Sequence, residues 1–266
     1  MTSFLWLPTL TKAASTALLV VTASALAEKL GPFWGALVAS LPVSTGPAYV
    51  FLALQHDAAF VAESLLSSFA AHAATGAFMT TYGLLARRRT LGRSLGPAML
   101  VWLVVGYATL QVAWTPLSAL ALNVVVYAVC LTVLRPRHPR PGEIRPTPRR
   151  RWYELPCRAA AVALFVIVVV AASNMLGPQA TGLVAIFPIG TVCLAVILQP
   201  RLGGVATSLM AASSLRAMVG FGGMLLVAHL AIPAWGMVTG MLAGLAVSLF
   251  WSALLLLAHR WRRPAG

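Results

Sequence analysis

The sequence predicts an all-α polytopic membrane protein of about nine transmembrane helices. We expect a four-helix repeat, one linking helix and an inverted copy of the repeat. Two observations lead to this prediction. The 266-residue chain is 60% hydrophobic and only 9% charged, whereas a soluble domain is about 45–50% apolar and about 25% charged. In addition, one apolar segment with a proline near its middle occurs twice.

The duplicated segment reads LGPFWGALVASLPVST from residue 30 and LGPQATGLVAIFPIGT from residue 176. Both copies share the LGP triplet. Both have a proline in the middle of the segment, Pro42 and Pro188, and a threonine three residues later, Thr45 and Thr191. The coincidence of these features favours duplication over chance.

Apolar runs close to the roughly 20 residues that cross a bilayer predict the individual spans. They lie near residues 12–28, 33–54, 58–86, 96–113, 116–134, 157–175, 178–199, 203–229 and 233–258. The first run resembles a signal peptide, but its alignment with 157–175 favours a retained helix. The expected regions are the first repeat (1–113), the linking helix (114–134), a cytoplasmic linker (135–156) and the inverted repeat (157–266).

The basic residues predict the orientation of these spans. If the N-terminus is outside, the inner loops hold all but two of the 19 Lys and Arg residues, which is the positive-inside pattern. The net charge of +14 therefore indicates topology and not binding of nucleic acid. We expect the chain in the bacterial inner (plasma) membrane, with its N-terminus outside, its C-terminus cytoplasmic and the lipid bilayer as its partner.

The prolines of the duplicated segment define the first candidate site. Each proline removes a backbone donor and frees a carbonyl, which in a membrane must find a partner or line a polar cavity. Hydroxyls and glycines at the same depth suit a substrate-binding site between two discontinuous helices. The alternative is an ordinary proline kink, with Ser and Thr bonded to the backbone. The candidate residues are Pro42, Ser44, Thr45, Gly46, Pro188, Gly190 and Thr191.

Ionisable residues inside the spans define the second candidate site, because they are costly in lipid and usually face a cavity or a partner. Glu63 and His72 are candidates for proton coupling, and Arg216 for contact with an anionic substrate. Ser68 and Ser214 belong to the same polar stripes. A structural Glu63–Arg216 ion pair is an equal alternative, and a simple packing hydrogen bond is the alternative for His72.

These observations predict a secondary transporter or exporter of a small anionic solute, coupled to an ion gradient. The alternative is a non-transporting accessory protein, a scaffold or a lipid-handling protein. Enzyme signatures and nucleotide motifs are absent from the sequence, so we expect no catalytic residue, cofactor or bound metal. A small molecule or ion is the expected partner, and homo-oligomerisation is left open.

The motif Gly182-Leu183-Val184 followed by Phe187-Pro188, with Leu37-Val38 and Leu41-Pro42 in the first copy, resembles the GlpM-type membrane proteins. These are uncharacterised four-span proteins of about one repeat's length. The resemblance covers residues 12–113 and 157–258 and implies a fused, duplicated form of such a protein. The family has no established activity to carry over.

Overall fold

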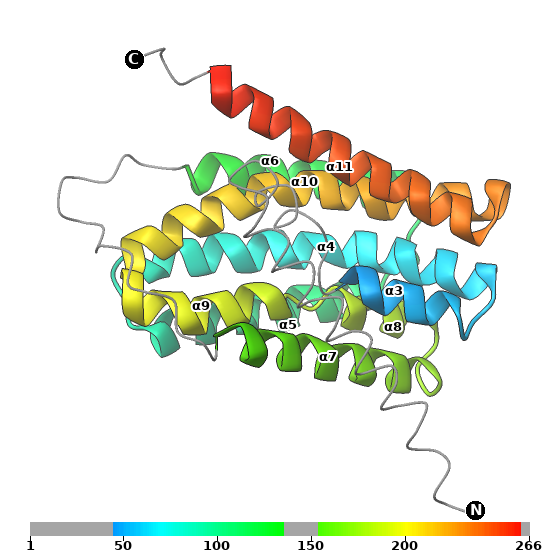
Figure 1. The fold of residues 1–266 in the computed structure, drawn as a ribbon, viewed down its shortest axis with the longest axis horizontal. Coiled ribbons are helices and arrows are strands. Elements are labelled where there is room, and N and C mark those ends of the chain that lie inside the picture. The colour runs from blue at the N-terminus through cyan, green and yellow to red at the C-terminus, as the bar shows by residue number, and fades with distance from the viewer. Residues whose placement is uncertain (1–44, 136–153, 262–266) are drawn as a thin grey trace, which may run out of the picture.

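The computed structural model describes residues 45–135 and 154–261, and this part of the chain is all-helical. Figure 1 shows the long helices lying side by side along one axis. The described helices are α3 (Thr45–Ala53), α4 (Ala58–Ala86), α5 (Leu91–Leu110), α6 (Pro116–Val133), α7 (Glu154–Ser173), α8 (Pro178–Ala185), α9 (Ile189–Leu202), α10 (Gly204–Trp235) and α11 (Met237–Trp261).

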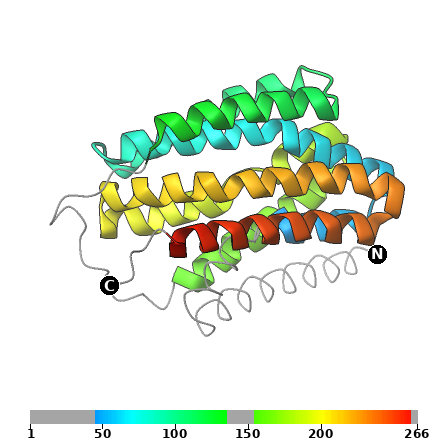
Figure 2. The same cartoon turned by 90° about the horizontal axis from the view of Figure 1, so that it is seen from above.

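The central helix of the described bundle is α4. It packs against α5, α6, α8 and α10, and Figures 1 and 2 show it enclosed by these neighbours. Its sequence explains why, because Ser64, Ser68, His72 and Thr75 are all buried along it. Such a helix is too polar to face lipid, and its polar groups need protein partners. The partners come from the surrounding helices.

Five segments in the described chain are long and apolar enough to cross a membrane, which supports a membrane protein. They are α5, α6, the α8–α9 segment, α10 and the part of α11 up to Ala258. The helix α7 contributes a shorter apolar stretch, Ala160–Ser173. The described residues therefore support five spans and not nine. The expected span 12–28 and most of 33–54 lie outside the described residues, and the inverted repeat stays a prediction.

Two expected helix boundaries were wrong. The span expected near 96–113 is α5, which begins at Leu91 because Thr90 adopts the extended N-cap conformation and Pro97 is accommodated inside the helix. The last span was expected to begin near Pro233, yet α10 runs through that proline to Trp235. Gly236, with φ of 84°, ends α10 because a left-handed residue stops a helix more sharply than a proline within its last turn.

The described charges are unequally divided between the two ends of the bundle. Figure 1 places the end of α4, the start of α5, the ends of α6 and α9 and the start of α10 together. That end carries Arg87, Arg88, Arg89, Arg93, Arg135 and Arg201. Arg87, the C-cap residue of α4, links α4 to α10, since its Nε donates to Ser208 Oγ at 2.8 Å. The α3–α4 turn, with Asp57, lies at the opposite end.

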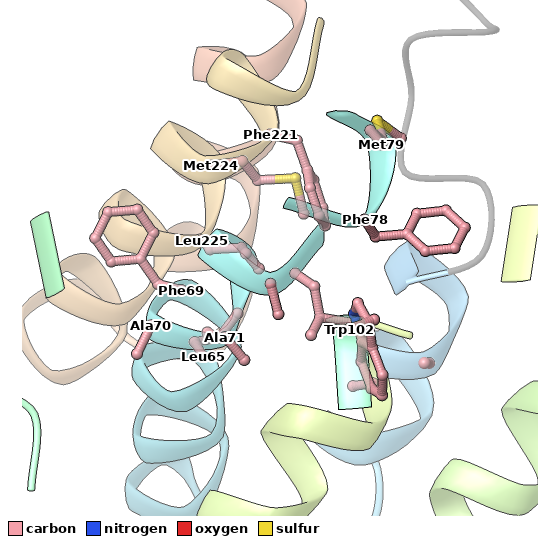
Figure 3. Packing of buried hydrophobic residues seen from close by; sticks show 14 of the residues in the cluster. Leu65, Phe69, Ala70, Ala71, Phe78, Met79, Trp102, Phe221, Met224 and Leu225 are labelled. Atoms are coloured by element: carbon pink, nitrogen blue, oxygen red, sulfur yellow. The ribbon is translucent and has the colours of Figure 1, made fainter. Parts of the chain in front are cut away.

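The apolar core fills the space between α4 and α10. Figure 3 shows Phe221 and Met224 of α10 close to the α4 ribbon, with Phe69 of α4 nearby. All three side chains are buried, and Leu225 is fully enclosed. Small residues bring α10 and α11 together as well: a Cβ placed at Gly220 would collide with the Trp251 side chain. Close approach through small residues is the usual packing mode of membrane helices.

Candidate functional site

The apolar segment from Pro178 to Leu202 is broken at Ile186–Pro188. The N–H groups of Ile186 and Phe187 reach back only three residues, to the carbonyls of Leu183 and Val184. Pro188 has no N–H to donate. Ile189 N–H bonds to the carbonyl of Phe187 at 2.7 Å. The carbonyl of Ala185 therefore loses the partner that Ile189 would provide in a continuous helix.

Hydroxyl groups from two other helices donate to the carbonyls beside this break. Thr45 of α3 donates through Oγ1 to the Ala185 carbonyl at 3.2 Å. Thr75 of α4 lies 3.5 Å from the Ile186 carbonyl and accepts from the indole N–H of Trp102 at 3.4 Å. Phe187 packs edge-on to Trp102, with ring centroids 5.0 Å apart. The break is thus held by Thr45 and Thr75 and covered on one side by aromatic rings.

The first part of the interrupted segment, α8, rests directly on α4. Ser68 donates through Oγ to the Gly182 carbonyl at 2.5 Å. The Tyr49 hydroxyl lies 2.7 Å from the same Ser68 Oγ and 2.9 Å from the Ser64 carbonyl. A side chain at Gly182 would collide with the Ser64 carbonyl. Glycine is therefore required where α8 and α4 meet, and the hydroxyls of Ser68 and Tyr49 fill the contact.

His72 lies at the junction of α4, α6 and α10 and is 1% exposed. Its Nε2 is 2.9 Å from the Met218 carbonyl oxygen and 2.8 Å from the Tyr127 hydroxyl. A carbonyl only accepts, so Nε2 carries the proton and donates to Met218. The other nitrogen, Nδ1, is buried without a hydrogen-bond partner. A Cβ at Gly222 would lie 2.9 Å from the imidazole Cδ2, which leaves little room beside the ring.

Glu63 is exposed near the start of α4 and faces a cleft of about 50 Å³. Its Oε1 accepts from the side-chain amide of Gln179, at the start of α8, at 3.4 Å. Ser67, one turn further along α4, donates to the Gln179 backbone carbonyl at 2.6 Å. Thr109 and Trp114 line the cleft from the α5 side. Glu63 therefore adjoins the first turn of the interrupted segment.

A second cleft, of about 30 Å³, borders α9 on the other side of the break. Thr191 and Ser214 line it together with Tyr82 and Thr207, and its remaining walls are apolar. Gly190 precedes Thr191 and has open space around its Cα. The structure thus brings Thr191 and Ser214 to one cleft, and their role in substrate binding stays a prediction.

Arg216 lies apart from both clefts. Its side chain is exposed on α10, and its backbone carbonyl accepts from the Trp251 indole at 2.9 Å. Glu63 forms its hydrogen bond with Gln179 and not with Arg216. No ion pair joins these two described residues, so the alternative of a Glu63–Arg216 pair was wrong. Span positions alone do not show how a helix is rotated about its axis, so the sequence could not exclude this pair.

The remaining candidate residues divide between the described and masked parts of the chain. Pro42 and Ser44 lie outside the described residues. Gly46 is half-buried in the first turn of α3, beside Thr45. Pro188 is buried at the break and precedes α9. Among the described residues, no group of His, Cys, Asp and Glu is arranged to hold a metal ion.

Sequence reasoning missed several uncharged polar residues that hold the interrupted segment in place. Gln199, 6% exposed in α9, accepts from Tyr82 at 2.9 Å and Ser94 at 3.2 Å and donates to the Arg89 carbonyl at 3.0 Å. Gln179 and Tyr49 play comparable parts near α8. A glutamine within or beside an apolar span would have indicated these residues, but the sequence prediction considered mainly charged residues in the spans.

The interrupted segment, the apolar spans and the buried polar contacts of α4 define a polytopic α-helical membrane protein. The chain matches no family model, no curated protein and no solved structure. The resemblance to the GlpM-type proteins therefore stays a prediction.

Proposed function

We propose that this chain is a secondary transporter or exporter of a small anionic solute, driven by an ion gradient. The observation that carries the proposal is the break at Ile186–Pro188 inside an apolar segment of membrane-spanning length. Interrupted helices near the bilayer midplane are a recurrent feature of secondary transporters, where they bind substrates and ions. The inference from architecture to function is an analogy.

The positions of the two clefts support this proposal. One cleft borders Gln179 at the start of α8, and the other borders Thr191 and Leu198 of α9. The break lies between them along the chain. Alternating access requires that a central site open to each side of the membrane in turn. We take the two clefts as the starting points of those two paths, with Thr45, Ser68 and the break between them.

Arg216 is the proposed residue for charge neutralisation of the substrate. It lies midway along α10, its side chain is exposed, and the described residues offer it no ion pair. An arginine cannot readily lose its charge, and exposure to lipid at this depth is costly. A polar path or an anionic ligand beside α10 would satisfy the guanidinium. Glu63 or His72 would then couple a proton to solute movement.

We place the arginine-rich end of the bundle in the cytoplasm of a bacterial cell. Arg87, Arg88, Arg89 and Arg93 lie in or beside the α4–α5 turn at this end. The positive-inside bias supports this orientation, with the N-terminus outside and the C-terminus inside. The orientation is tested with a cysteine placed at Asp57 or at Arg88 in a chain whose native Cys130, Cys157 and Cys193 are replaced. A membrane-impermeant thiol reagent should label the first variant in intact cells and the second only in opened cells.

The experiment that tests transport is a ligand screen by thermal unfolding of the purified protein. Small anions, amino acids and sugars are compared at two pH values, with Arg216→Ala beside the wild type and Arg88→Ala as an exposed-arginine control. An anion that raises the melting temperature of the wild type and of Arg88→Ala, but not of Arg216→Ala, supports the proposal. That anion is then tested for uptake into proteoliposomes, and absence of gradient-dependent flux would contradict it.

A specific observation favours the second candidate, a non-transporting accessory or lipid-handling protein. The carbonyls of Ala185 and Ile186 already accept from Thr45 and Thr75, and the described clefts measure only about 50 and about 30 Å³. A break whose carbonyls already have hydrogen-bond donors is also compatible with a purely structural kink. In that case no ligand would shift the melting temperature of either the wild type or Arg216→Ala.

A further inference from the structure

Two ionisable side chains of α4 are candidates for the coupling group, and their surroundings differ. His72 is enclosed by Tyr127, Phe221 and Gly222, and its protonated nitrogen is already bonded to Met218. No described cleft reaches it. Glu63 faces a cleft and is exposed. A cation from solution therefore has access to Glu63 and not to His72 in this conformation.

The cleft around Glu63 has the chemistry of a site for a small cation. The carboxylate has no basic partner among the described residues, and three residues with hydroxyl or amide side chains, Ser67, Thr109 and Gln179, line the cleft. Carboxylate, hydroxyl and amide oxygens are the preferred ligands of hard cations. None of the other described lining residues, including Trp114 of the α5–α6 turn, is ionisable. The charge of Glu63 is thus the only one that a cation meets in this cleft.

Glu63 is also connected to the interrupted segment. Its carboxylate accepts from the Gln179 side chain, and Ser67 holds the Gln179 backbone. Three residues later, Gly182 touches the α4 backbone at Ser64. The carboxylate bond is charge-assisted, and such a bond weakens when the acceptor is neutralised. A change at Glu63 therefore acts on the first turn of α8, one short helix away from the break.

We infer that Glu63 is the binding group for the coupling cation, and that the bound cation loosens α8 by releasing Gln179. The ligand is a monovalent cation, either a sodium ion on the carboxylate or a proton added to it. The coupling role rests on the proposed transport function, whereas cation binding and the response of α8 do not. The following experiment measures binding and response without any solute.

The test uses the full chain in phosphatidylcholine nanodiscs, with hydrogen–deuterium exchange as the readout. Exchange at 181–185 in α8 is compared with exchange in α10 under three conditions. The conditions are about 0.1 M sodium chloride at about pH 8, the same concentration of N-methylglucamine chloride at the same pH, and N-methylglucamine chloride at about pH 4. Rates are corrected for the slower intrinsic exchange of amides in acid and expressed relative to α10. A corrected rate of α8 that rises in sodium identifies a sodium site, and one that rises only in acid identifies a proton site.

We expect α8 to exchange about three to ten times faster when Glu63 is neutralised, as for loss of one hydrogen bond. Glu63→Gln should abolish the response. Asp57→Asn, which changes another exposed acid at the same end, and His72→Gln should retain it. Gln179→Ala should still be stabilised by the cation in thermal unfolding, yet show no cation-dependent change in α8.

Three results would overturn the inference: no response of α8 to sodium or acid in the wild type, a full response in Glu63→Gln, or loss of the response in His72→Gln with a folded protein. A cation response without solute flux would leave the binding site in place and reject only the proposed transport. Solute flux without a cation response would reject the cation site at Glu63 and leave the proposed transport in place. The two proposals can therefore fail separately.

Discussion

The interrupted segment α8–α9 and the continuous helix α10 both pack on α4, but by different means. Polar side chains of α4 bond to α8–α9 along its length, with Ser68 on Gly182 and Tyr82 on Gln199. Between α4 and α10 the contact is mostly apolar, with Phe69, Phe221 and Leu225 in one buried cluster. Two histidine contacts supplement it, His72 to Met218 and His229 to Ala62.

The two segments also differ in how each accommodates a proline. Pro188 separates α8 from α9, whereas Pro233 lies inside α10 without ending it. A break in lipid is tolerated only where other groups satisfy the freed carbonyls, and Thr45 supplies that bond at Ala185. Hydrogen bonds to a break can be exchanged for others, while a close-packed interface resists gradual change. If the proposed transport function holds, we therefore expect α8–α9 to be the segment that moves and α10 the one that supports it.

The largest expected effect is at the point where α8 touches α4. Gly182→Ala places a methyl group against the Ser64 carbonyl, so α8 must move away or the two backbones must shift. We expect a loss of about 2–3 kcal/mol in unfolding free energy, as for an overpacked site. Gly190→Ala is the matched control, because nothing lies within 4 Å of its added Cβ. Thermal unfolding of both variants in the same detergent measures the difference, and equal stability would contradict the close contact.

The next effect concerns the far end of the interrupted segment. Gln199→Leu removes the acceptor of Tyr82 and Ser94 and the donor to the Arg89 carbonyl. Because three hydrogen bonds are lost and the Tyr82 hydroxyl is buried, we expect a cost of about 2 kcal/mol. Gln179→Leu removes the single bond to Glu63 at the other end of the segment and should cost only about 1 kcal/mol. Chemical unfolding of both variants ranks them, and the reverse order would show that α8 is the anchored half.

The effect at the break itself should depend on Pro188. Thr45→Val leaves the Ala185 carbonyl without its donor and should cost about 1 kcal/mol, as for hydrogen bonds between membrane helices. Pro188→Ala restores an N–H and allows a continuous helix, in which Ile189 can serve Ala185. The cost of Thr45→Val should therefore shrink in the Pro188→Ala background. A double-mutant cycle on unfolding free energies measures this coupling, and additive effects would contradict it.

Much of the helical arrangement was predictable because its signals are local. The sequence positions of α4 and α6 agree closely with the expected runs 58–86 and 116–134, since turn residues and caps such as Asp57 and Thr115 mark their starts. The break at Pro188 was also predicted, because proline has no backbone N–H to donate. The inverted repeat depends on residues outside the described part of the chain and stays a prediction.

The composition of the candidate site was less predictable because it depends on helix rotation and on pairing between distant segments. Arg216 and Met218 differ by two positions, yet only the Met218 carbonyl contacts His72. Gln199 carries no charge and belongs to no motif, although it bonds to three partners. Pairings of this kind arise from tertiary packing, which span lengths and charge counts do not contain.

The smallest expected effect lies beside the α4–α10 contact, where Tyr127 of α6 reaches the same His72 that bonds to Met218. Tyr127→Phe removes the hydroxyl 2.8 Å from His72 Nε2 but retains the ring, which stacks on the imidazole at 4.9 Å. Because Met218 still accepts from His72, we expect a cost of only about 0.5–1 kcal/mol. Tyr107→Phe, at a tyrosine 65% exposed on α5, is the matched control and should be neutral. If Tyr127→Phe costs more than Thr45→Val in thermal unfolding, then the Tyr127–His72 contact contributes more to stability than the hydrogen bond at the break.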